Sequence, residues 1–248
     1  MLTEERYTLI LRILEIKKSA SISILSKELK ISESTVRRDL NALSEMGKLI
    51  KVYGGATVLD SNFIIEERSV KTKSKLFVNE KTAIAKYAAS TIKSNDFIYI
   101  DSGTTTERMI DFITSKNITV VTNGFTHAKK LSMKGINCYV VGGLVKGLTE
   151  AIVGSECVRS IHKYNFSKCY MGTNGIDINA GFSTPDLDEA NVKTAACEQS
   201  QKVFVLADHS KFDNVTAVKF ADIRSAKIIT DKVPNDIYKT VCMVEEVL

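Results

Sequence analysis

The 248-residue sequence has no tryptophan. It has only three histidines, so few imidazole side chains are available for metal chemistry. Its five cysteines are widely spaced, odd in number and without a C-x-x-C pair, which argues against a zinc site and against a disulfide framework. Such cysteine usage fits a reducing compartment. We therefore expect a cytoplasmic protein that holds no metal and no cofactor.

Signals for membranes and secretion are also missing. No apolar run approaches the roughly 20 residues that span a bilayer. The first ten residues, MLTEERYTLI, carry acids where a signal peptide would have bases. With 44% hydrophobic and 25% charged residues, the composition is that of an ordinary globular protein of one or two domains. The net charge of +5 permits nucleic acid as a partner without requiring it.

Residues 31–47, ISESTVRRDLNALSEMG, have the signals of a two-faced helix. Ser32 is a good N-cap, Glu33 suits the positive end of the helix dipole, and Gly47 marks the C-terminal end. Helical spacing predicts one buried stripe, which consists of Val36, Leu40, Leu43 and Met46.

The other face of this helix carries small polar side chains and two arginines: Ser34, Thr35, Arg37, Arg38 and Asn41. Small residues suit entry into a DNA major groove, and arginines suit phosphates or guanine edges. An Arg-Arg pair on an amphipathic helix is more often a solvated surface, so the neighbouring elements must decide between the two interpretations.

Two helices are predicted before this stretch and a hairpin after it. The first helix begins at Thr3, and its buried stripe consists of Tyr7, Ile10, Leu11 and Leu14. The second covers residues 21–30, with Ser23 as its cap and Leu25 and Leu29 buried. Strands over Leu49–Val52 and Ala56–Val58 flank Gly54 and Gly55, which is a hairpin signal.

This order of elements predicts a winged helix-turn-helix DNA-binding domain over residues 1–58. The hairpin would be the wing, and it would bring Lys48, Lys51 and Tyr53 to the DNA backbone or minor groove beside the recognition helix. The alternative is a small helical module that binds another protein.

Residues 59–80 are charge-rich and weakly periodic, and we interpret them as a linker with one helical stretch. From residue 81 to 248, helical segments alternate with short apolar runs. These runs are Phe97–Ile100, Thr119–Val121, Cys138–Val141, Lys168–Met171, Val203–Leu206 and Lys227–Ile229. Runs that are apolar at every position suit strands covered on both faces, so the pattern predicts a parallel α/β sheet.

Ligands of such sheets bind at the carboxyl ends of the strands. The segments that follow the predicted strands there are DSGTTT from Asp101, Thr122-Asn123-Gly124, Gly142-Gly143, and the glycines 172 and 175. Small and hydroxyl residues let backbone amides surround an anion, although G-x4-G-K-[ST] is absent. One such end would be a simple turn, whereas four together favour a polyol or phosphate pocket.

Charged residues are found at a predicted helix start and after a predicted strand in the later part of the sequence. Asp188, Glu189 and Lys193 lie near a helix start after Pro185, where dipole and i,i+4 electrostatics alone would explain them. Residues 208–211, DHSK, follow a strand, and Lys211 suits a phosphate oxygen. A hydrolytic triad from residues 208–210 is disfavoured, because sequence neighbours cannot normally stack in that way and no G-x-S-x-G motif exists.

The sequence resembles the DeoR family of bacterial transcriptional regulators over nearly its whole length. In the first half, the stretch SISILSKELKISESTVRRDLNALSEMGKLIKVYGGA carries the resemblance. In the second half it lies in EKTAIAKYAA, DSGTTT, VTNG, VGG, MGTNGI, STPDLDEANVK, LADHSKF and IITD. Tyr53 stands where the family more usually has His, and Gly124 where it often has Ser.

The resemblance implies a ribose-5-phosphate-isomerase-like sensor domain that binds a phosphorylated sugar and controls DNA affinity. The same resemblance assigns phosphate or sugar contacts to Asp101, Gly103, Thr104 and Thr105. It assigns the role of charged pocket residues to Glu189, Lys193 and Lys211. With the strand ends, the predicted effector set becomes Asp101, Gly103, Thr104, Thr105, Thr122, Asn123, Gly142, Gly143, Gly172, Glu189, Lys193 and Lys211.

These observations predict a regulator, a repressor of a carbohydrate operon, that binds double-stranded operator DNA and forms a homo-oligomer. Its predicted DNA contacts are Ser34, Thr35, Arg37, Arg38, Asn41, Lys48, Lys51 and Tyr53. The rival is a sugar-phosphate isomerase with an appended DNA-binding domain, in which Glu189 would be the base and Lys211 the electrophile. A nucleoid protein is a third possibility, disfavoured by the low net charge.

Overall fold

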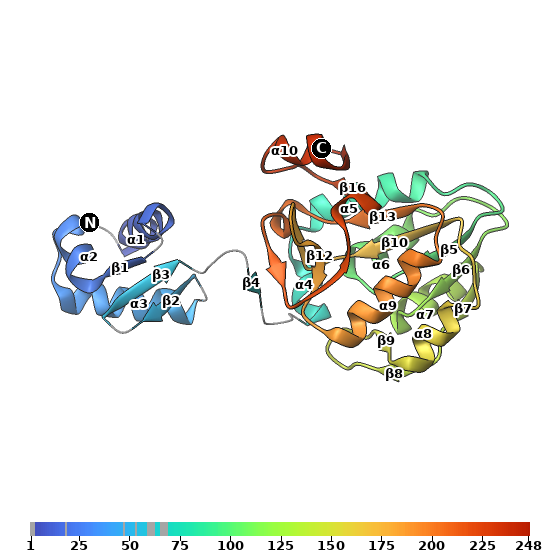
Figure 1. The fold of residues 1–248 in the computed structure, drawn as a ribbon, viewed down its shortest axis with the longest axis horizontal. Helices are drawn as coiled ribbons and strands as arrows, with labels where there is room; N and C mark the ends of the chain where they lie inside the picture. Colours follow the sequence, from blue (N-terminus) through green and yellow to red (C-terminus); the bar gives the residue numbers. More distant parts are fainter. Residues whose placement is uncertain (1–2, 18, 47, 53, 59–62, 65–68) are drawn as a thin grey trace. The chain divides into compact units, whose positions relative to one another are not determined.

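The computed structural model describes residues 3–17, 19–46, 48–52, 54–58, 63–64 and 69–248 (Figure 1). The chain divides into two compact units, residues 1–61 and 62–248. None of the described helices is long and apolar enough to cross a membrane. Gly47 and Tyr53, which the sequence assigns to a helix end and to DNA contact, lie outside the described residues.

The first unit is a three-helix domain with a small sheet. Its elements are α1 (Thr3–Lys17), β1 (Ser19–Ser21), α2 (Ile22–Leu29), α3 (Glu33–Glu45), β2 (Leu49–Val52) and β3 (Gly55–Val58). β3 pairs antiparallel with both β1 and β2, so the predicted hairpin is confirmed and gains a third strand. The core contains Ile10, Leu14, Leu25, Leu29, Val36, Leu40 and Leu43. This is the predicted winged helix-turn-helix.

Two local predictions in this unit are wrong. Ser21, not Ser23, caps α2, because β1 ends at Ser21 and the helix starts directly after it; the Ser21 hydroxyl accepts from the Ile24 amide at 3.3 Å. Met46 is 55% exposed rather than buried. It follows the end of α3, where the chain turns away through a 2.8 Å hydrogen bond from the Lys48 amide to the Leu43 carbonyl.

The glycine pair of the hairpin has two separate roles. Gly54 has φ +79°, a left-handed conformation that glycine adopts without strain. Gly55 lies so close to β1 that a Cβ at this position would be 2.3 Å from the Ala20 carbonyl oxygen. The sequence therefore needs both glycines, one for the turn and one for the approach of the third strand.

The second unit is built on a seven-stranded, all-parallel sheet in the order β17-β16-β13-β10-β5-β6-β7, most of which is labelled in Figure 1. Its strands are β5 (Phe97–Ile100), β6 (Thr119–Thr122), β7 (Asn137–Val140), β10 (Lys168–Gly172), β13 (Val203–Leu206), β16 (Lys227–Thr230) and β17 (Met243–Glu246). All six predicted strands are present. β17 was not predicted; it pairs with β16 and forms one edge.

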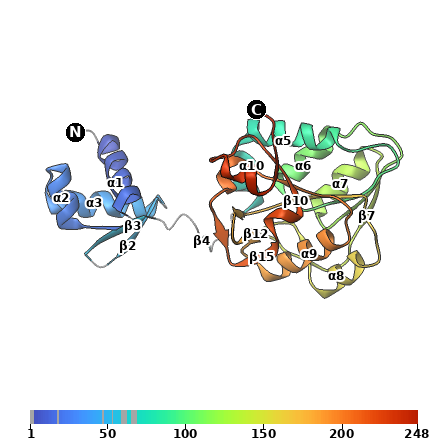
Figure 2. The ribbon, with the colours of Figure 1, turned by 45° about the horizontal axis from the view of Figure 1, so that its top comes forward.

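Helices cover both faces of this sheet. One core cluster joins Ile98, Ile100 and Val120 to α5 (Val78–Ser90), α6 (Thr104–Asp111) and α7 (Phe125–Met133). The other joins Tyr99 and Val121 to α8 (Ser155–Ile161), α9 (Leu187–Glu198) and α10 (Ile237–Val241). Successive side chains of a strand point to opposite faces, which explains why these runs are apolar throughout. Figure 2 shows α5, α6 and α7 on the side opposite α8 and α9.

The prediction that every run is covered on both faces is wrong for β7. This strand is the other edge of the sheet, and Tyr139 and Val140 are 51% and 48% exposed. Within residues 59–80, interpreted as a linker, the structure has β4 (Phe63–Ile64), α4 (Val70–Lys75) and the start of α5.

Smaller elements complete the second unit. A three-stranded antiparallel sheet consists of β11 (Gly175–Asp177), β12 (Gly181–Thr184) and β15 (Val218–Ala221). Two strand pairs are β8 (Leu144–Val145) with β9 (Ile152–Val153) and β4 with β14 (Val215–Thr216), and two 3-10 turns are His209–Lys211 and Ile223–Ser225.

Candidate functional site

The strand order of the large sheet reverses between β5 and β10. From β5 the chain proceeds to β6 and β7 on one side, and from β10 to β13, β16 and β17 on the other. In open parallel sheets the connections diverge at such a point and leave a crevice beyond the carboxyl ends of the strands. A cavity lies there and is lined by residues of both strand ends.

One wall of the cavity is the loop that joins β5 to α6. Asp101 is almost fully buried, and its Oδ2 accepts from the Gly172 amide at 3.0 Å, which ties the end of β5 to the end of β10. Gly103 is the N-cap of α6 and has no side chain for the exposed amides of the first turn. The N-terminal end of α6, with Thr104 and Thr105, therefore opens into the cavity.

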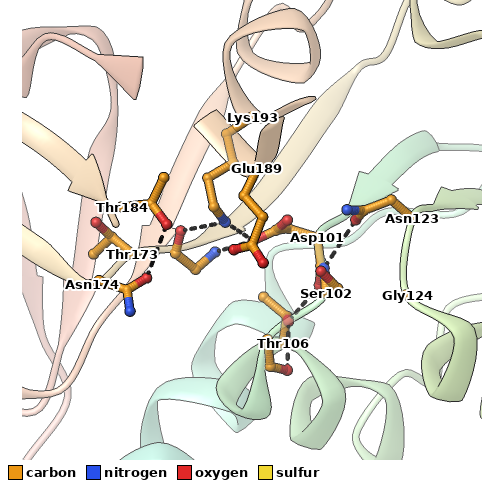
Figure 3. A network of polar contacts seen from close by, with 12 residues as sticks. Asp101, Ser102, Thr106, Asn123, Gly124, Thr173, Asn174, Thr184, Glu189 and Lys193 are labelled. Carbon is orange, nitrogen blue, oxygen red and sulfur yellow. Dashed lines mark hydrogen bonds and ion pairs between the residues drawn. The ribbon is translucent and has the colours of Figure 1, made fainter. Parts of the chain in front are cut away.

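A second layer of buried groups holds this loop in place. The Asn123 Oδ1 accepts from the Ser102 amide at 3.1 Å, and the Thr106 hydroxyl lies 2.6 Å from the Asp101 carbonyl oxygen (Figure 3). His127 Nε2 lies 3.3 Å from the Gly103 amide and accepts from it. Burial lowers the pKa of His127 to about 4, so the ring is neutral at pH 7 and suited to this accepting role.

His127 also explains a departure from the family pattern. A Cβ on Gly124 would lie 2.5 Å from His127 Nδ1, so glycine is required while this imidazole occupies its place. The hydroxyl that a serine would supply at position 124 is therefore incompatible with the buried histidine.

Helix α9 brings two charged side chains into the cavity one turn apart. Lys193 forms a buried ion pair with Asp101 and donates to the Gly172 carbonyl at 3.1 Å. Glu189 Oε1 accepts from the Thr149 hydroxyl at 2.8 Å and lies 3.2 Å from Lys146 Nζ. The alternative explanation, favourable charges at a helix start, remains suitable for their neighbour Asp188. This residue is exposed and does not line the cavity.

Further lysines line the cavity. Lys81, on α5, is 4% exposed and donates to the Lys73 carbonyl at 2.5 Å. Burial lowers the Lys81 pKa to about 8, an effect that Asp208 opposes and that Lys211, Arg108 and Lys73 reinforce. Two of these cations, Lys73 and Lys211, line the same cavity. An anion placed there would restore the charged form of Lys81, because opposite charge favours it.

The segment at residues 208–211 is not a hydrolytic triad. Asp208 Oδ1 accepts from the Ser210 amide at 3.1 Å and caps a short 3-10 turn. His209 Nδ1 lies 2.6 Å from a carboxylate oxygen of Asp231 instead. The turn places Lys211 in the lining of the cavity.

The structure brings together eight of the twelve predicted effector residues. These are Asp101, Gly103, Thr104, Thr105, Gly172, Glu189, Lys193 and Lys211. Thr122 and Asn123 lie behind the wall, where the Thr122 hydroxyl donates to the Ile100 carbonyl at 2.6 Å. Gly142 and Gly143 follow the edge strand and do not line the cavity.

Sequence reasoning missed several lining residues, including Lys73, Lys81, Thr149, Thr173 and Asn174. For Lys81 a signal was present: it lies three, four and seven residues before Ile84, Ala85 and Ala88, which form the buried face of α5. A lysine is almost never fully buried unless it is paired, so its place on an apolar helical face indicates a specific role. Asn174 gives no such signal, because its place depends on a 3.3 Å hydrogen bond from the Thr184 hydroxyl to its Oδ1.

The polar face of α3 matches its prediction. Ser34, Arg37, Arg38 and Asn41 are exposed, and Thr35 is half-buried beside the cap Ser32, whose hydroxyl accepts from the Thr35 amide at 3.2 Å. Arg37 pairs with Glu33 at 3.3 Å. Lys48 and Lys51 are also exposed, and the Lys51 ammonium donates to the Asn41 amide oxygen, which joins β2 to the helix.

One buried contact that sequence reasoning missed fixes this helix to its domain. Asp39, on the apolar side of α3, is 3% exposed. Arg6 of α1 donates two hydrogen bonds to the Asp39 carboxylate, from Nε to Oδ2 at 2.8 Å and from Nη2 to Oδ1 at 2.9 Å. A two-point contact restricts rotation of α3 against α1 and so fixes which side chains it exposes.

Two family models match this chain, one in each unit. The model of the DeoR-like helix-turn-helix domain matches residues 6–62, and that of the DeoR C terminal sensor domain matches residues 77–232. A solved ribose 5-phosphate isomerase from Plasmodium falciparum is similar with a TM-score of 0.40 and 17% identity, over 53% of this chain and 52% of that one.

Curated relatives match over most of their length. The uncharacterized HTH-type transcriptional regulator FruR of Bacillus subtilis is 44% identical, with 93% of this chain and 91% of that protein covered. The regulator IolR of the same organism is 34% identical over 90% and 89% of the two chains. A lactose phosphotransferase system repressor of Staphylococcus epidermidis is 32% identical over 86% and 85%. These relatives are named as regulators, not as isomerases, and this chain belongs to the DeoR family of transcriptional regulators.

Proposed function

We propose that this chain is a cytoplasmic repressor of a carbohydrate operon, and that a phosphorylated sugar in the second unit controls its binding to operator DNA. The observation that carries the proposal is that the lining of the cavity combines two kinds of chemistry. The N-terminal end of α6 and the ammonium groups of Lys81 and Lys211 suit an anionic ester. The carboxylates and hydroxyls of the same cavity suit the hydroxyl groups of a sugar.

In this proposal the phosphate lies at the first turn of α6. The amides of Thr104 and Thr105 belong to the unpartnered end of that helix, where the dipole favours negative charge. Glu189 accepts hydrogen bonds from sugar hydroxyls, and Asn174 offers both a donor and an acceptor. The buried Asp101–Lys193 pair also lines the cavity, and its members bind the Gly172 amide and carbonyl, which holds them in position.

DNA recognition is assigned to the first unit. The exposed polar face of α3 enters the major groove, where Arg38 contacts a base edge or phosphate and the smaller Ser34 allows close approach. Lys48 and Lys51 contact the backbone beside it, and Tyr53, which lies outside the described residues, is proposed from the sequence as a further contact. Related proteins are named as repressors of a lactose phosphotransferase system and, in Escherichia coli O157:H7, putatively of an aga operon, which supports repression of sugar genes.

The domain limits proposed from sequence are 1–58 for DNA binding, 59–80 for the connection and 81–248 for effector binding and homo-oligomer formation. An oligomer would place two α3 helices on one operator, as most helix-turn-helix proteins require. The cavity includes Val70 and Lys73, so the effector-binding part begins earlier than residue 81 in this proposal.

A thermal-shift screen against phosphorylated sugars, with the unphosphorylated sugars as matched controls, tests the effector. A specific ligand raises the Tm by mass action, and only the ester should do so. Fluorescence anisotropy with a duplex from the promoter of the chain's own operon, against a shuffled duplex, tests the DNA partner. Equal affinity for both duplexes and no Tm shift with any ester would refute the proposal.

A further inference from the structure

Helix α4 is a short element that the rest of the second unit must hold in place. It has six residues, none of them buried, and its N-cap is Ser69. Helices of this length are unstable in isolation, so tertiary contacts must supply what the short hydrogen-bonded ladder does not. It is also the first helix after the boundary between the two units at residues 61 and 62.

Three hydrogen bonds fasten the two ends of α4. At its start, the Val70 amide donates to the Leu148 carbonyl at 3.1 Å. At its end, Arg108 Nη2 donates to the Ser74 carbonyl at 3.1 Å and Lys81 Nζ to the Lys73 carbonyl at 2.5 Å. Both donors at the C-terminal end are cations, which suits the negative end of a helix dipole.

The Lys81 contact links α4 to the cavity. An ammonium group has three N–H donors, and the Lys73 carbonyl takes one, which leaves others for an anion in the cavity that Lys81 lines. Val70 and Lys73, both on α4, line that cavity too. One ligand would therefore contact α4 directly and also the side chain that holds its C-terminal end.

We propose that α4 is an effector-ordered tether: a phosphorylated ligand bridges Lys81 and α4 and fastens this helix to the sheet domain. This inference rests on the proposed function, because it requires an anionic ligand in the cavity. The ligand acts only through its stronger interaction with the fastened state, and it shifts the population of α4 toward that state. Strand β4, which precedes α4, is already paired with β14, so fastening α4 adds a second attachment to the segment that leads to the DNA-binding unit.

Hydrogen–deuterium exchange of the full-length chain tests the tether, with fructose 1-phosphate as the probe and inorganic phosphate beside it. Fructose 1-phosphate should slow exchange of the amides of residues 70–77 by about tenfold, because exchange requires local opening. Helix α8, another short helix with no residue in the cavity, is the internal control and should not change.

Substitution of Arg108 tests the fastening of α4 without removing a residue that lines the cavity. Loss of Arg108 raises the Lys81 pKa, so at pH 7 Lys81 stays mostly protonated in both proteins. Arg108→Met should speed exchange in residues 70–77 without ligand, keep the Tm shift caused by fructose 1-phosphate, and reduce the effect of that ligand on DNA affinity. The matched control is Arg159→Met, which removes an exposed arginine of α8 paired with Glu156.

The outcomes distinguish this inference from the proposed function. A Tm shift with unchanged exchange in residues 70–77 would refute the tether and leave the effector site standing. Exchange in Arg108→Met equal to that in Arg159→Met would refute it as well. If no phosphorylated sugar of the thermal-shift panel, fructose 1-phosphate included, shifts the Tm, the proposed effector is wrong and the tether is refuted with it.

Discussion

The titration of Lys81 gives a quantitative test of the effector site. Burial lowers the pKa of this lysine from 10.5 to about 8, and the neighbouring cations Lys211, Arg108 and Lys73 act in the same direction while Asp208 opposes them. At pH 7 about 90% of the Lys81 side chains are protonated, and at pH 9 about 10%, as follows from that pKa. A bound phosphate stabilises the ammonium form, so binding takes up a proton above pH 8.

The sign and size of the effect follow from this linkage. Affinity for a sugar phosphate should be nearly constant from pH 7 to 7.5 and should then fall as the pH rises through 8. The slope approaches a tenfold rise in Kd per pH unit, and the loss between pH 7 and 9 is about tenfold. Titration of the ligand itself does not contribute to this pH dependence, because the second pKa of a phosphate monoester is about 6.

Isothermal titration calorimetry at constant ionic strength, from pH 6.5 to 9.5, measures the dependence. Lys81→Arg is the matched control, since a guanidinium stays charged throughout this range. It should flatten the profile, whereas Lys81→Met should bind weakly at every pH. A wild-type Kd that does not change from pH 7 to 9.5, or an equally steep profile in Lys81→Arg, would show that Lys81 does not contact the phosphate.

Three further outcomes are expected. Arg38→Ala should weaken operator binding about 10- to 100-fold in an anisotropy assay while the fold, checked by circular dichroism, is kept; unchanged affinity would remove Arg38 from the DNA contacts. Lys211→Ala should keep operator affinity but lose the response to sugar phosphate, and a normal response would exclude Lys211 from the site. Gly55→Ala should destabilise the first unit by about 1–3 kcal/mol in urea unfolding, because its Cβ would lie 2.3 Å from a backbone oxygen. Gly54→Asn, in an open left-handed turn, should cost less than about 1 kcal/mol, and equal losses at both glycines would contradict this account.

Local patterns were enough to predict the three helices of the first unit, its hairpin and six of the seven strands of the large sheet, and the failures discussed next have local causes. Ser32 was assigned correctly because a helix start depends on a few consecutive residues. Ser23 and Met46 were wrong because a strand before one helix and a turn after another moved the helix ends by one or two residues. Strand β17 was missed, since its residues are half-exposed at a sheet edge and lack a continuous apolar run.

Only some of the residues that line the cavity could be predicted from the sequence. Residues that directly follow a strand, such as Asp101 and Gly172, were predicted because parallel strands end at one edge of the sheet. Thr122 and Asn123 also follow a strand, but their side chains turn inward to hold the neighbouring loop. Which strand ends face the cavity depends on the strand order, and the sequence does not encode that order in any local pattern.

The sequence alone therefore determined the two-part organisation, the polar face of α3, the parallel sheet and the loop from Asp101, because each depends on periodicity or on adjacent residues. Only the tertiary structure decided that Lys81 of α5 and Lys73 of α4 join Lys211 around one cavity, and that Arg6 holds Asp39. These contacts join residues distant along the chain, and their energies depend on burial and distance, which exist only after the chain has folded.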